Sequence, residues 1–168
     1  MLEELLEVAG QLGISTRLVR QEESGDIGSA VILQHERRAV VAFDQGTYVL
    51  LTHVIEIPPR IAEVASRRPN GAVSLVEYVT HGVGPSRCTL VADIDVQDGK
   101  PIARRLVVEQ RVVLEAGRPE TGQRLADGLV EILNVAILSA SLLSQTAERE
   151  GRPPSRSGPD EPSEWMFR

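Results

Sequence analysis

Residues 129–143 read Leu-Val-Glu-Ile-Leu-Asn-Val-Ala-Ile-Leu-Ser-Ala-Ser-Leu-Leu, and they occupy the middle of a predicted helix from Thr121 to Ala147. This stretch is apolar almost all the way round, whereas a helix that covers a single core needs only one apolar stripe. The helix therefore has a second apolar face to bury. The sequence predicts a domain that buries this face against another chain.

Helical spacing divides the apolar residues of this helix between two faces. The stripe predicted to face a sheet consists of Leu125, Leu129, Ile132, Leu133, Ala136, Ala140 and Leu143. Val130, Ile137 and Leu138 fall outside that stripe. A third layer of strands could cover them, but the rest of the chain leaves little spare sequence for one. We therefore predict a homodimer interface at Val130, Ile137 and Leu138.

The remaining patterns predict helices and strands in separate blocks. Period-2 alternation and the hairpin signal Asp98-Gly99 indicate strands, and apolar spacing of three and four indicates helices. Such segregated blocks indicate an α+β fold, in which an N-terminal, a middle and a long C-terminal helix pack on an antiparallel sheet. The predicted helices are 2–12, 60–68 and 121–147, and the predicted strands are 14–20, 29–34, 39–43, 47–57, 72–80, 88–96 and 102–114.

The length of 168 residues fits one domain, which we expect to span residues 1–147. Residues 148–168 are rich in Arg, Pro, Ser, Gly and acids, so they are predicted to form a disordered tail. Two of the five aromatic residues of the chain lie in its motif Trp165-Met166-Phe167. Exposed aromatic and Met side chains serve as anchors of docking peptides, so these three residues are predicted to dock on a partner. Folding back onto the protein's own body and simple disorder are the alternatives.

The net charge of −6 argues against direct nucleic-acid binding, which needs a basic surface. The arginine pairs at 37–38, 67–68 and 104–105 are interpreted as dispersed solubilising charge, because adjacent strand residues point to opposite faces. The N-terminus lacks the pattern of a signal peptide, and the apolar stretch at 129–143 is short and carries Glu131 and Asn134. We therefore expect a cytoplasmic protein that does not bind a membrane.

No motif predicts catalysis, a metal site or a cofactor. His35, His53 and His81 have no ligand-like spacing. The acids between 93 and 98 resemble a calcium loop but lack the required glutamate, so a solvated strand face is the preferred interpretation. Cys88 lies on the apolar face of its predicted strand, where a thiol is normally inert, and a single cysteine excludes an internal disulfide. We expect no enzymatic activity.

The order of helices and strands resembles the YbjN family, which is similar in fold to type III secretion chaperones. The resemblance is carried by Arg105-Leu-Val-Val-Glu-Gln-Arg-Val-Val-Leu-Glu-Ala-Gly117, running into Arg118-Pro-Glu-Thr-Gly-Gln-Arg-Leu125, which look like that family's last strand, turn and helix start. It covers residues 1–146 as architecture. The sequence departs from the pattern by an extra predicted strand in the second block and by its arginine-rich tail. Roadblock-like and profilin-like domains have a similar mixture of elements.

The resemblance implies a small, acidic, homodimeric protein that binds other proteins without catalysis through sheet and helix surfaces. The residues themselves lead to the same first hypothesis, a dimeric protein-interaction module that is chaperone-like or regulatory. The second hypothesis is a small-molecule-binding or enzymatic domain with a pocket between the sheet and the C-terminal helix. The third is an adaptor that presents paired copies of its tail motif.

Overall fold

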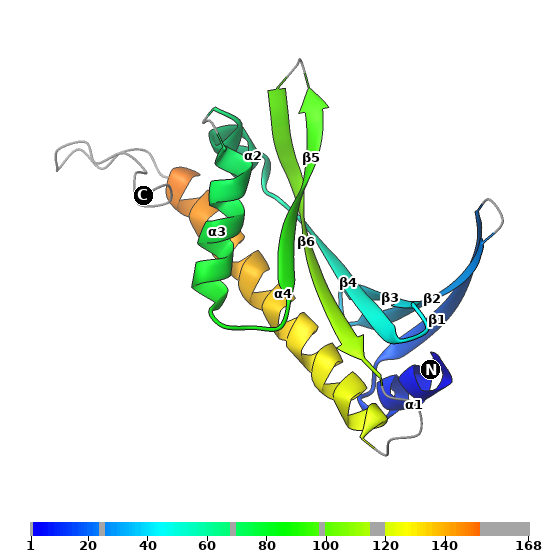
Figure 1. The fold of residues 1–168 in the computed structure, drawn as a ribbon. Helices are drawn as coiled ribbons and strands as arrows, with labels where there is room; N and C mark the ends of the chain where they lie inside the picture. Colours follow the sequence, from blue (N-terminus) through cyan, green and yellow to red (C-terminus); the bar gives the residue numbers. More distant parts are fainter. Residues whose placement is uncertain (1, 24–25, 68–69, 98–99, 115–119, 152–168) are drawn as a thin grey trace. The chain divides into compact units, whose positions relative to one another are not determined.

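The computed structural model describes residues 2–23, 26–67, 70–97, 100–114 and 120–151 (Figure 1). The strands in these ranges are β1 (Ser15–Glu23), β2 (Asp26–His35), β3 (Arg38–Asp44), β4 (Tyr48–Glu56), β5 (Thr89–Gln97) and β6 (Lys100–Val113). The helices are α1 (Leu2–Gln11), α2 (Pro59–Ser66), α3 (Gly71–Val83) and α4 (Thr121–Gly151).

The strands form one sheet in the order β1-β2-β3-β4-β6-β5. From β1 to β4 each strand pairs antiparallel with the next, so that Val40 on β3 lies opposite Leu33 on β2 and His53 on β4. The turn after β3 contains Gly46, whose positive φ of 80° suits glycine, and the Gly46 N–H donates a hydrogen bond to Asp44 Oδ1 at 2.9 Å. The predicted α+β class with an antiparallel sheet is confirmed.

Contacts within the chain gather in two compact units that alternate along the sequence. Unit 1 consists of residues 1–54, 87–89 and 108–135. Unit 2 consists of residues 55–86, 90–107 and 136–168. The elements β4, β6 and α4 therefore contribute to both units, as does β5 through its first residue, Thr89. The extent of the domain, predicted as residues 1–147, stays a prediction.

The core of unit 1 lies between the strands and the helices α1 and α4. Leu5 of α1, Leu51 of β4 and Leu129 of α4 are completely buried there. Gly128 lets α4 approach the strands closely, because a Cβ at this position would lie 2.6 Å from Val112 Cγ2 and 3.5 Å from Leu51 Cδ1. Each leucine buried in this way contributes roughly 1.5–3 kcal/mol to stability.

The segment 72–80 is not a strand, as predicted, but part of helix α3 in unit 2. Its Val, Tyr and Thr residues favour strands by propensity. The buried Leu75 and Val79 are nevertheless four residues apart, and this spacing puts both on one face of a helix. Gly71 allows α3 to begin directly against the backbone of Ala65 in α2. Packing has thus overridden the local propensity, and the extra strand in the second block disappears.

Helix α3 also packs on the second half of α4 within unit 2. Tyr78 Oη and Thr146 Oγ1 lie 3.2 Å apart, and a Cβ at Gly82 would lie 2.7 Å from Leu142 Cδ1. Helix α4 ends at Gly151, one turn beyond its predicted end. The part of the predicted tail from residue 152 onwards, including Trp165, Met166 and Phe167, lies outside the described residues.

Among the described helices, α4 is long and apolar enough over Thr121–Arg149 to cross a membrane, judged by length and composition alone. A core helix of a soluble protein meets the same criterion. In this protein 39% of the relevant window is buried against other parts of the chain.

Candidate interaction surfaces

One face of α4 is exposed along the helix and carries the three residues predicted to form a dimer interface. The side chains of Val130, Ile137 and Leu138 are 46%, 40% and 47% exposed. The sheet-facing stripe predicted for the same helix is buried or half-buried. The exposed residues Gln145 and Arg149 lie beside this face. We name the face itself the outer stripe of α4: Gln123, Asp127, Val130, Asn134, Ile137, Leu138, Ser141, Ser144 and Glu148.

The spacing within the outer stripe is typical of a helix that pairs with another helix. Apart from Leu138, its members follow one another at alternating intervals of four and three residues, which is the repeat of a coiled-coil seam. The middle of the stripe is apolar, at Val130, Ile137 and Leu138, while both ends are polar or acidic. This surface can therefore form a short apolar contact that is bounded by polar residues at both ends.

A second apolar surface, which the sequence reasoning missed, lies on the face of the unit 1 sheet that α4 does not cover. On β4 the odd-numbered residues 49–53 are buried toward α4, while the even-numbered residues point to the opposite side. Cross-strand register joins Leu50 to Phe43 and Val41 to Ile32 on that side. We name this set the open face: Ile32, Val41, Phe43, Tyr48, Leu50, Val54 and Val113.

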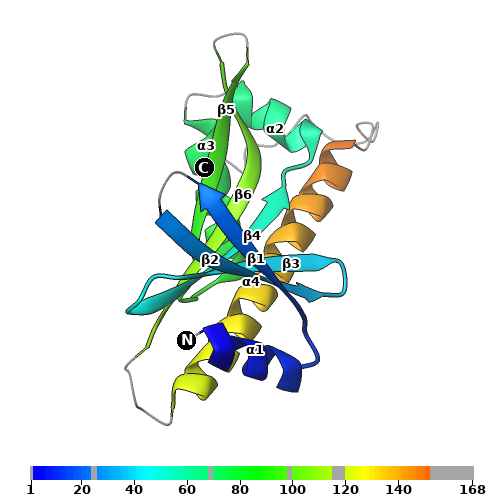
Figure 2. The ribbon, with the colours of Figure 1, turned by 90° about the vertical axis from the view of Figure 1, so that its right-hand side faces the viewer.

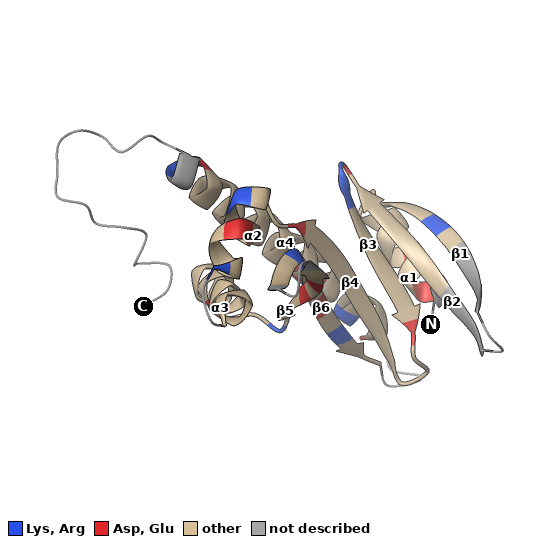
Figure 3. Ribbon diagram, turned by 90° about the horizontal axis from the view of Figure 1, so that it is seen from above, with Lys and Arg blue, Asp and Glu red and all other residues tan. Residues whose placement is uncertain are grey.

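The side chains of the open face are half-buried or exposed in the single chain. Val54 is 47% exposed and Val113 is 58% exposed. Figure 2 looks onto this side, with β1, β2 and β3 in front of α4. Viewed from above, β3 and β4 are free of charged residues along most of their length (Figure 3). Apolar surfaces with few charges are typical of interaction sites.

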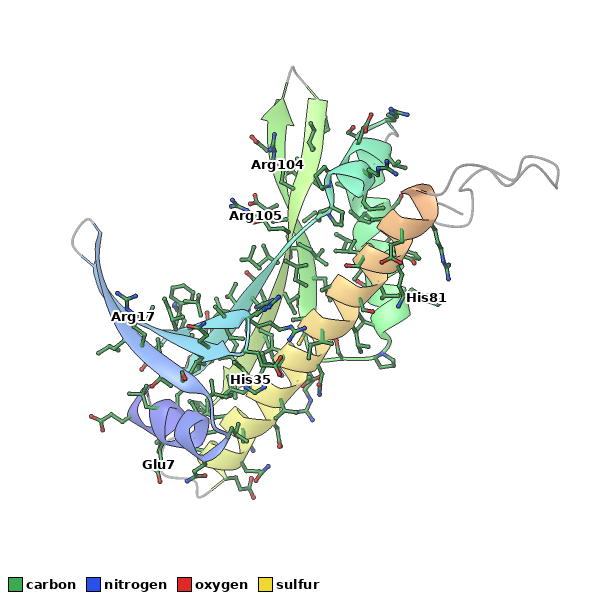
Figure 4. All side chains as sticks on the ribbon, turned by 180° about the vertical axis from the view of Figure 1, so that it is seen from behind. Glu7, Arg17, His35, His81, Arg104 and Arg105 are labelled. Atoms are coloured by element: carbon green, nitrogen blue, oxygen red, sulfur yellow. The ribbon has the colours of Figure 1, made fainter. Side chains whose placement is uncertain are left out.

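Two arginines flank the open face. Arg17 on β1 lies directly opposite Ile32, which places it at one side of the face. Figure 4 shows its side chain projecting from β1 on the side away from α1. At the other side, the guanidinium of Arg111 on β6 lies 5.7 Å from the centre of the Tyr48 ring, a cation–π distance. Glu109 lies on the same side of β6, two residues from Arg111, so the open face is apolar in the middle and carries charges of both signs at its sides.

The sequence did contain a signal for the open face. Residues 39–43 and 48–52 are apolar or small at almost every position, not at every second one. Such continuous runs are typical of strands that are buried on both faces, whereas strands with one solvated face alternate. These runs therefore indicate a second apolar face in addition to the positions of the strands.

A polar network holds Cys88 in unit 1. Gln110, which is buried, donates a hydrogen bond from Nε2 to Glu131 Oε2 at 2.8 Å, and the backbone N–H of Arg87 donates to Glu131 Oε1 at 2.7 Å. The thiol of Cys88 donates to Gln110 Oε1 at 3.7 Å. Burial raises the pKa of Cys88 from 9.0 to about 12, and the Glu131 carboxylate adds to this rise. A nucleophile needs the opposite shift.

We expect the native Cys88 thiol to react slowly with iodoacetamide at pH 8. The rise of its pKa from 9.0 to about 12 lowers the thiolate fraction about a thousandfold. A thiolate of higher pKa is more nucleophilic, and this raises the reaction rate by about 15- to 30-fold. The native protein should therefore react at least ~30-fold more slowly than the urea-unfolded chain. The exposed position Ser86 supplies the control, as Ser86→Cys in a Cys88→Ala background. Equal native rates for the two cysteines would contradict the prediction.

The other candidate chemical groups have structural partners. His53 is buried and donates from Nδ1 to the carbonyl of Ala39 at 2.8 Å. Of the acids that resemble a calcium loop, Asp95 pairs with Arg104 at 3.2 Å and Asp93 with Arg105 at 3.8 Å, while Asp98 lies outside the described residues. No group of three or more His, Cys, Asp and Glu residues in the described part of the chain could hold a metal ion.

Two surface grooves were found, one within each unit. The first, about 480 Å³, lies between α1 and the start of α4 and is lined by Glu4, Glu7, Val8, Gln11, Leu12, Thr121, Gly122, Gln123 and Ala126. The second, about 360 Å³, lies where α2 meets β4 and β6 and is lined by Glu56, Ile57, Pro59, Ala62, Glu63, Ser66, Ile102 and Arg104. Neither lies in the predicted place between the sheet and α4.

Comparison with known proteins gives a similarity of fold. The chain is similar to the crystal structure of YbjN, a candidate transcription regulator from E. coli, with a TM-score of 0.49 and 15% sequence identity. The matched region covers 87% of this chain and 93% of that chain. This likeness is to the family whose architecture the sequence resembles, and it concerns the fold alone. No protein-family model matches the chain, and no curated protein matches its sequence.

Proposed function

We propose that this protein is a non-enzymatic module that binds other proteins, and that two copies associate through the outer stripe of α4. The observation that carries this proposal is the exposure of Val130, Ile137 and Leu138 in the middle of a helix whose other side is buried. We assign to such a dimer a chaperone-like or regulatory role, which it performs on another protein in the cytoplasm. The net charge of −6 supports a protein partner over a nucleic acid.

An antiparallel pair of α4 helices suits the charges of the outer stripe best. In a parallel pair the two copies of Asp127 would face each other, and like charges repel, whereas Glu148 meets an acidic residue in either orientation, its own copy or Glu120. In an antiparallel pair centred on Asn134, Val130 meets Leu138 of the other copy and Asp127 meets Ser141. A two-fold contact of this kind is closed, since each copy uses the same patch. Asn134 then fixes the register by forming a hydrogen bond with Asn134 of the other copy, as a polar residue at a coiled-coil seam position does.

The energy available from the outer stripe predicts a weak, concentration-dependent dimer. Covering the exposed parts of Val130, Ile137 and Leu138 in both copies stabilises the pair by about 4–8 kcal/mol, whereas association costs about 4–15 kcal/mol. The free energy gained by burial and the free energy lost on association are therefore similar, so the dimer is weak. Oligomeric state must therefore be measured over a range of protein concentrations.

The test is sedimentation or light scattering over such a range. We expect the double substitution Ile137→Asp, Leu138→Asp to give monomers at concentrations where the parent is dimeric, because four carboxylates would be buried at the two-fold contact. Val73→Asp is the matched control, since Val73 is 55% exposed on α3 and lies outside the stripe. Its oligomeric state should equal that of the parent. Dimers that persist in the double variant would refute the interface.

Cysteine cross-linking gives an independent readout of the register. In a Cys88→Ala background, Asn134→Cys should form a disulfide-linked dimer under mild oxidation, because the two copies of residue 134 face each other at the centre. Ser144→Cys, also exposed on the stripe, should not cross-link to itself. The reverse result would contradict the antiparallel register while leaving association itself intact.

A further inference from the structure

We propose that the open face binds the open face of a second copy of this protein, in a contact separate from the pairing of α4. The charges of the face carry this proposal. Arg17 on β1 and Glu109 on β6 lie at opposite ends of one row of side chains that crosses the face. Such a row can pair with a copy of itself, because a two-fold rotation exchanges its two ends.

The first part of this row is fixed by the register of β1 to β4. Residues that lie directly opposite each other in neighbouring strands point to the same side of a sheet. From β1 to β4 the row consists of Arg17, Ile32, Val41 and Thr52, each opposite the next. Thr52 is one of the even-numbered residues of β4 that point away from α4. The row therefore lies on the open face.

The last part of the row is fixed by the pairing of β4 with β6. Two backbone hydrogen bonds join the ends of these strands, from the N–H of Leu114 to the carbonyl of Thr47 and from the N–H of Ile57 to the carbonyl of Arg104. Both bonds give the same antiparallel register, in which Glu109 lies opposite Thr52. The neighbouring Gln110 donates to Glu131 of α4, so Glu109 points to the other side. Glu109 therefore ends the row.

The charges at the two ends select the orientation of the second copy. The middle of the row lies on β3, because β1 and β2 lie on one side of this strand and β4 and β6 on the other. A two-fold axis along β3 places Arg17 of each copy over Glu109 of the other. An axis across the strands would place each residue over its own copy, and like charges repel. Packed sheets lie about 10 Å apart, and the long side chains of arginine and glutamate can meet across that gap.

Both charged ends are available for this contact. Within the described ranges of the chain, neither Arg17 nor Glu109 forms an ion pair. Arg111, the other charged residue on this part of β6, lies over the Tyr48 ring. A ligand of one charge sign would be attracted to one end of the row and repelled by the other. A second copy carries both signs in the reverse order, and its guanidinium–carboxylate hydrogen bonds are charge-assisted.

The same axis brings the apolar centres of the two faces together. Val41 and Phe43 of β3 point to the open side, so each meets its own counterpart near the axis. Both side chains are already half-buried in the single chain. They therefore lose less exposed area on association than the residues of the outer stripe, which are 40–47% exposed at its apolar middle. We expect the open faces to associate at higher protein concentrations than the α4 helices.

Reversal of one charge tests the contact in protein that cannot pair through α4. In an Ile137→Asp, Leu138→Asp background, sedimentation equilibrium should show monomers at low concentration and dimers at high concentration. Arg17→Glu places two carboxylates over each other at both ends of the dimer, and Glu109→Arg does the same with two guanidinium groups. Each single reversal should raise the dissociation constant of this dimer at least ~10-fold.

A mixture of the two single variants gives the sharpest result. One copy with Arg17→Glu and one copy with Glu109→Arg have opposite charges over each other at both ends, so the mixture should associate as tightly as the background protein. The chain that carries both reversals should also regain its self-association. No other occupant of the open face predicts this recovery, because recovery needs the two copies to face each other in the stated orientation.

Exposed charges outside the open face supply the matched controls. Arg60 on α2 and Glu77 on α3 are exposed and lie outside both the open face and the outer stripe. Arg60→Glu and Glu77→Arg should leave the dissociation constant of the background protein unchanged. All variants should keep the parental far-ultraviolet circular dichroism, because the charges that they reverse form no ion pair within the described part of the chain.

Three results would overturn the proposal. The first is a background protein that stays monomeric at the highest soluble concentration. The second is a pair of single reversals at Arg17 and Glu109 that dimerise as the background does. The third is a loss of association that mixing does not restore, which would assign the face to another ligand, such as segment 160–168. Failure of the α4 interface looks different: the parent and the Ile137→Asp, Leu138→Asp protein would then have the same size at every concentration.

Discussion

Leu129→Ala is expected to lower the free energy of unfolding by about 2–5 kcal/mol, which is a large part of the 5–15 kcal/mol that stabilises a typical domain. Leu129 is completely buried in unit 1, on the side of α4 that faces the sheet. The substitution removes three carbon atoms and leaves a cavity that the neighbouring strands cannot fill. Leucine and alanine have similar helix propensities, so the loss reports packing and not the helix itself. Urea unfolding followed by circular dichroism measures it.

The adjacent residue supplies the matched control. Val130 is 46% exposed on the outer stripe, so Val130→Ala removes little buried area from the single chain and slightly improves helix propensity. We expect a change within about 0.5 kcal/mol for the monomer. Because association adds stability by mass action, both variants must be compared at several protein concentrations. Similar losses for Leu129→Ala and Val130→Ala in dilute protein would mean that the assigned faces of α4 are wrong.

Gly128→Leu is the second substitution with a large expected effect, a loss of about 1–3 kcal/mol. In a helix interior the replacement of glycine by leucine normally stabilises by close to 1 kcal/mol. At this position, however, the new Cβ would lie 2.6 Å from Val112 Cγ2 and 3.5 Å from Leu51 Cδ1, and three further carbon atoms would have to fit beyond it. The helix must move away from the strands to admit them. Thermal or urea unfolding will show the loss.

Gly122→Ala is the counterpart of that substitution. Gly122 lies in the same helix and the same unit, but a Cβ there would meet only Val8 Cγ2, at the ordinary contact distance of 3.7 Å. We expect no loss of stability and a gain of at most about 1 kcal/mol. Destabilisation by Gly122→Ala, or an unchanged Gly128→Leu variant, would show that α4 does not approach β4 and β6 as described.

The sequence was sufficient to predict the fold class and the two faces of α4, because both follow from periodicity. Leu125, Leu129 and Ile132 are buried and Val130, Ile137 and Leu138 are exposed, as the helical spacing indicates. The helix α3 was misread because its valines, tyrosine and threonine favour strands, while the spacing of Leu75 and Val79 favours a helix. Local propensity favours a strand there and packing favours a helix, and packing determines the structure that forms.

The open face was harder to predict, because it is exposed only where no other element of the chain packs on that side of the sheet. Apolar residues on both sides of β3 and β4 indicate two buried faces, but the sequence cannot say whether the second cover comes from this chain or from a partner. The charged residues at the sides of the open face could not be predicted either. Arg17 and Arg111 are 94 positions apart in sequence, and only the strand order β1-β2-β3-β4-β6 places them on the same surface.

The interleaving of the two units has a consequence for the history of the gene. The chain passes from unit 1 to unit 2 after Val54, after Thr89 and after Val135, and it returns after Ser86 and after Val107. No single cut of the sequence releases either unit whole, and a separation would divide β4, β5, β6 and α4. Recombination could therefore transfer these units between genes only together. The open face and the outer stripe would therefore be passed on together, because both depend on elements that such an exchange cannot divide.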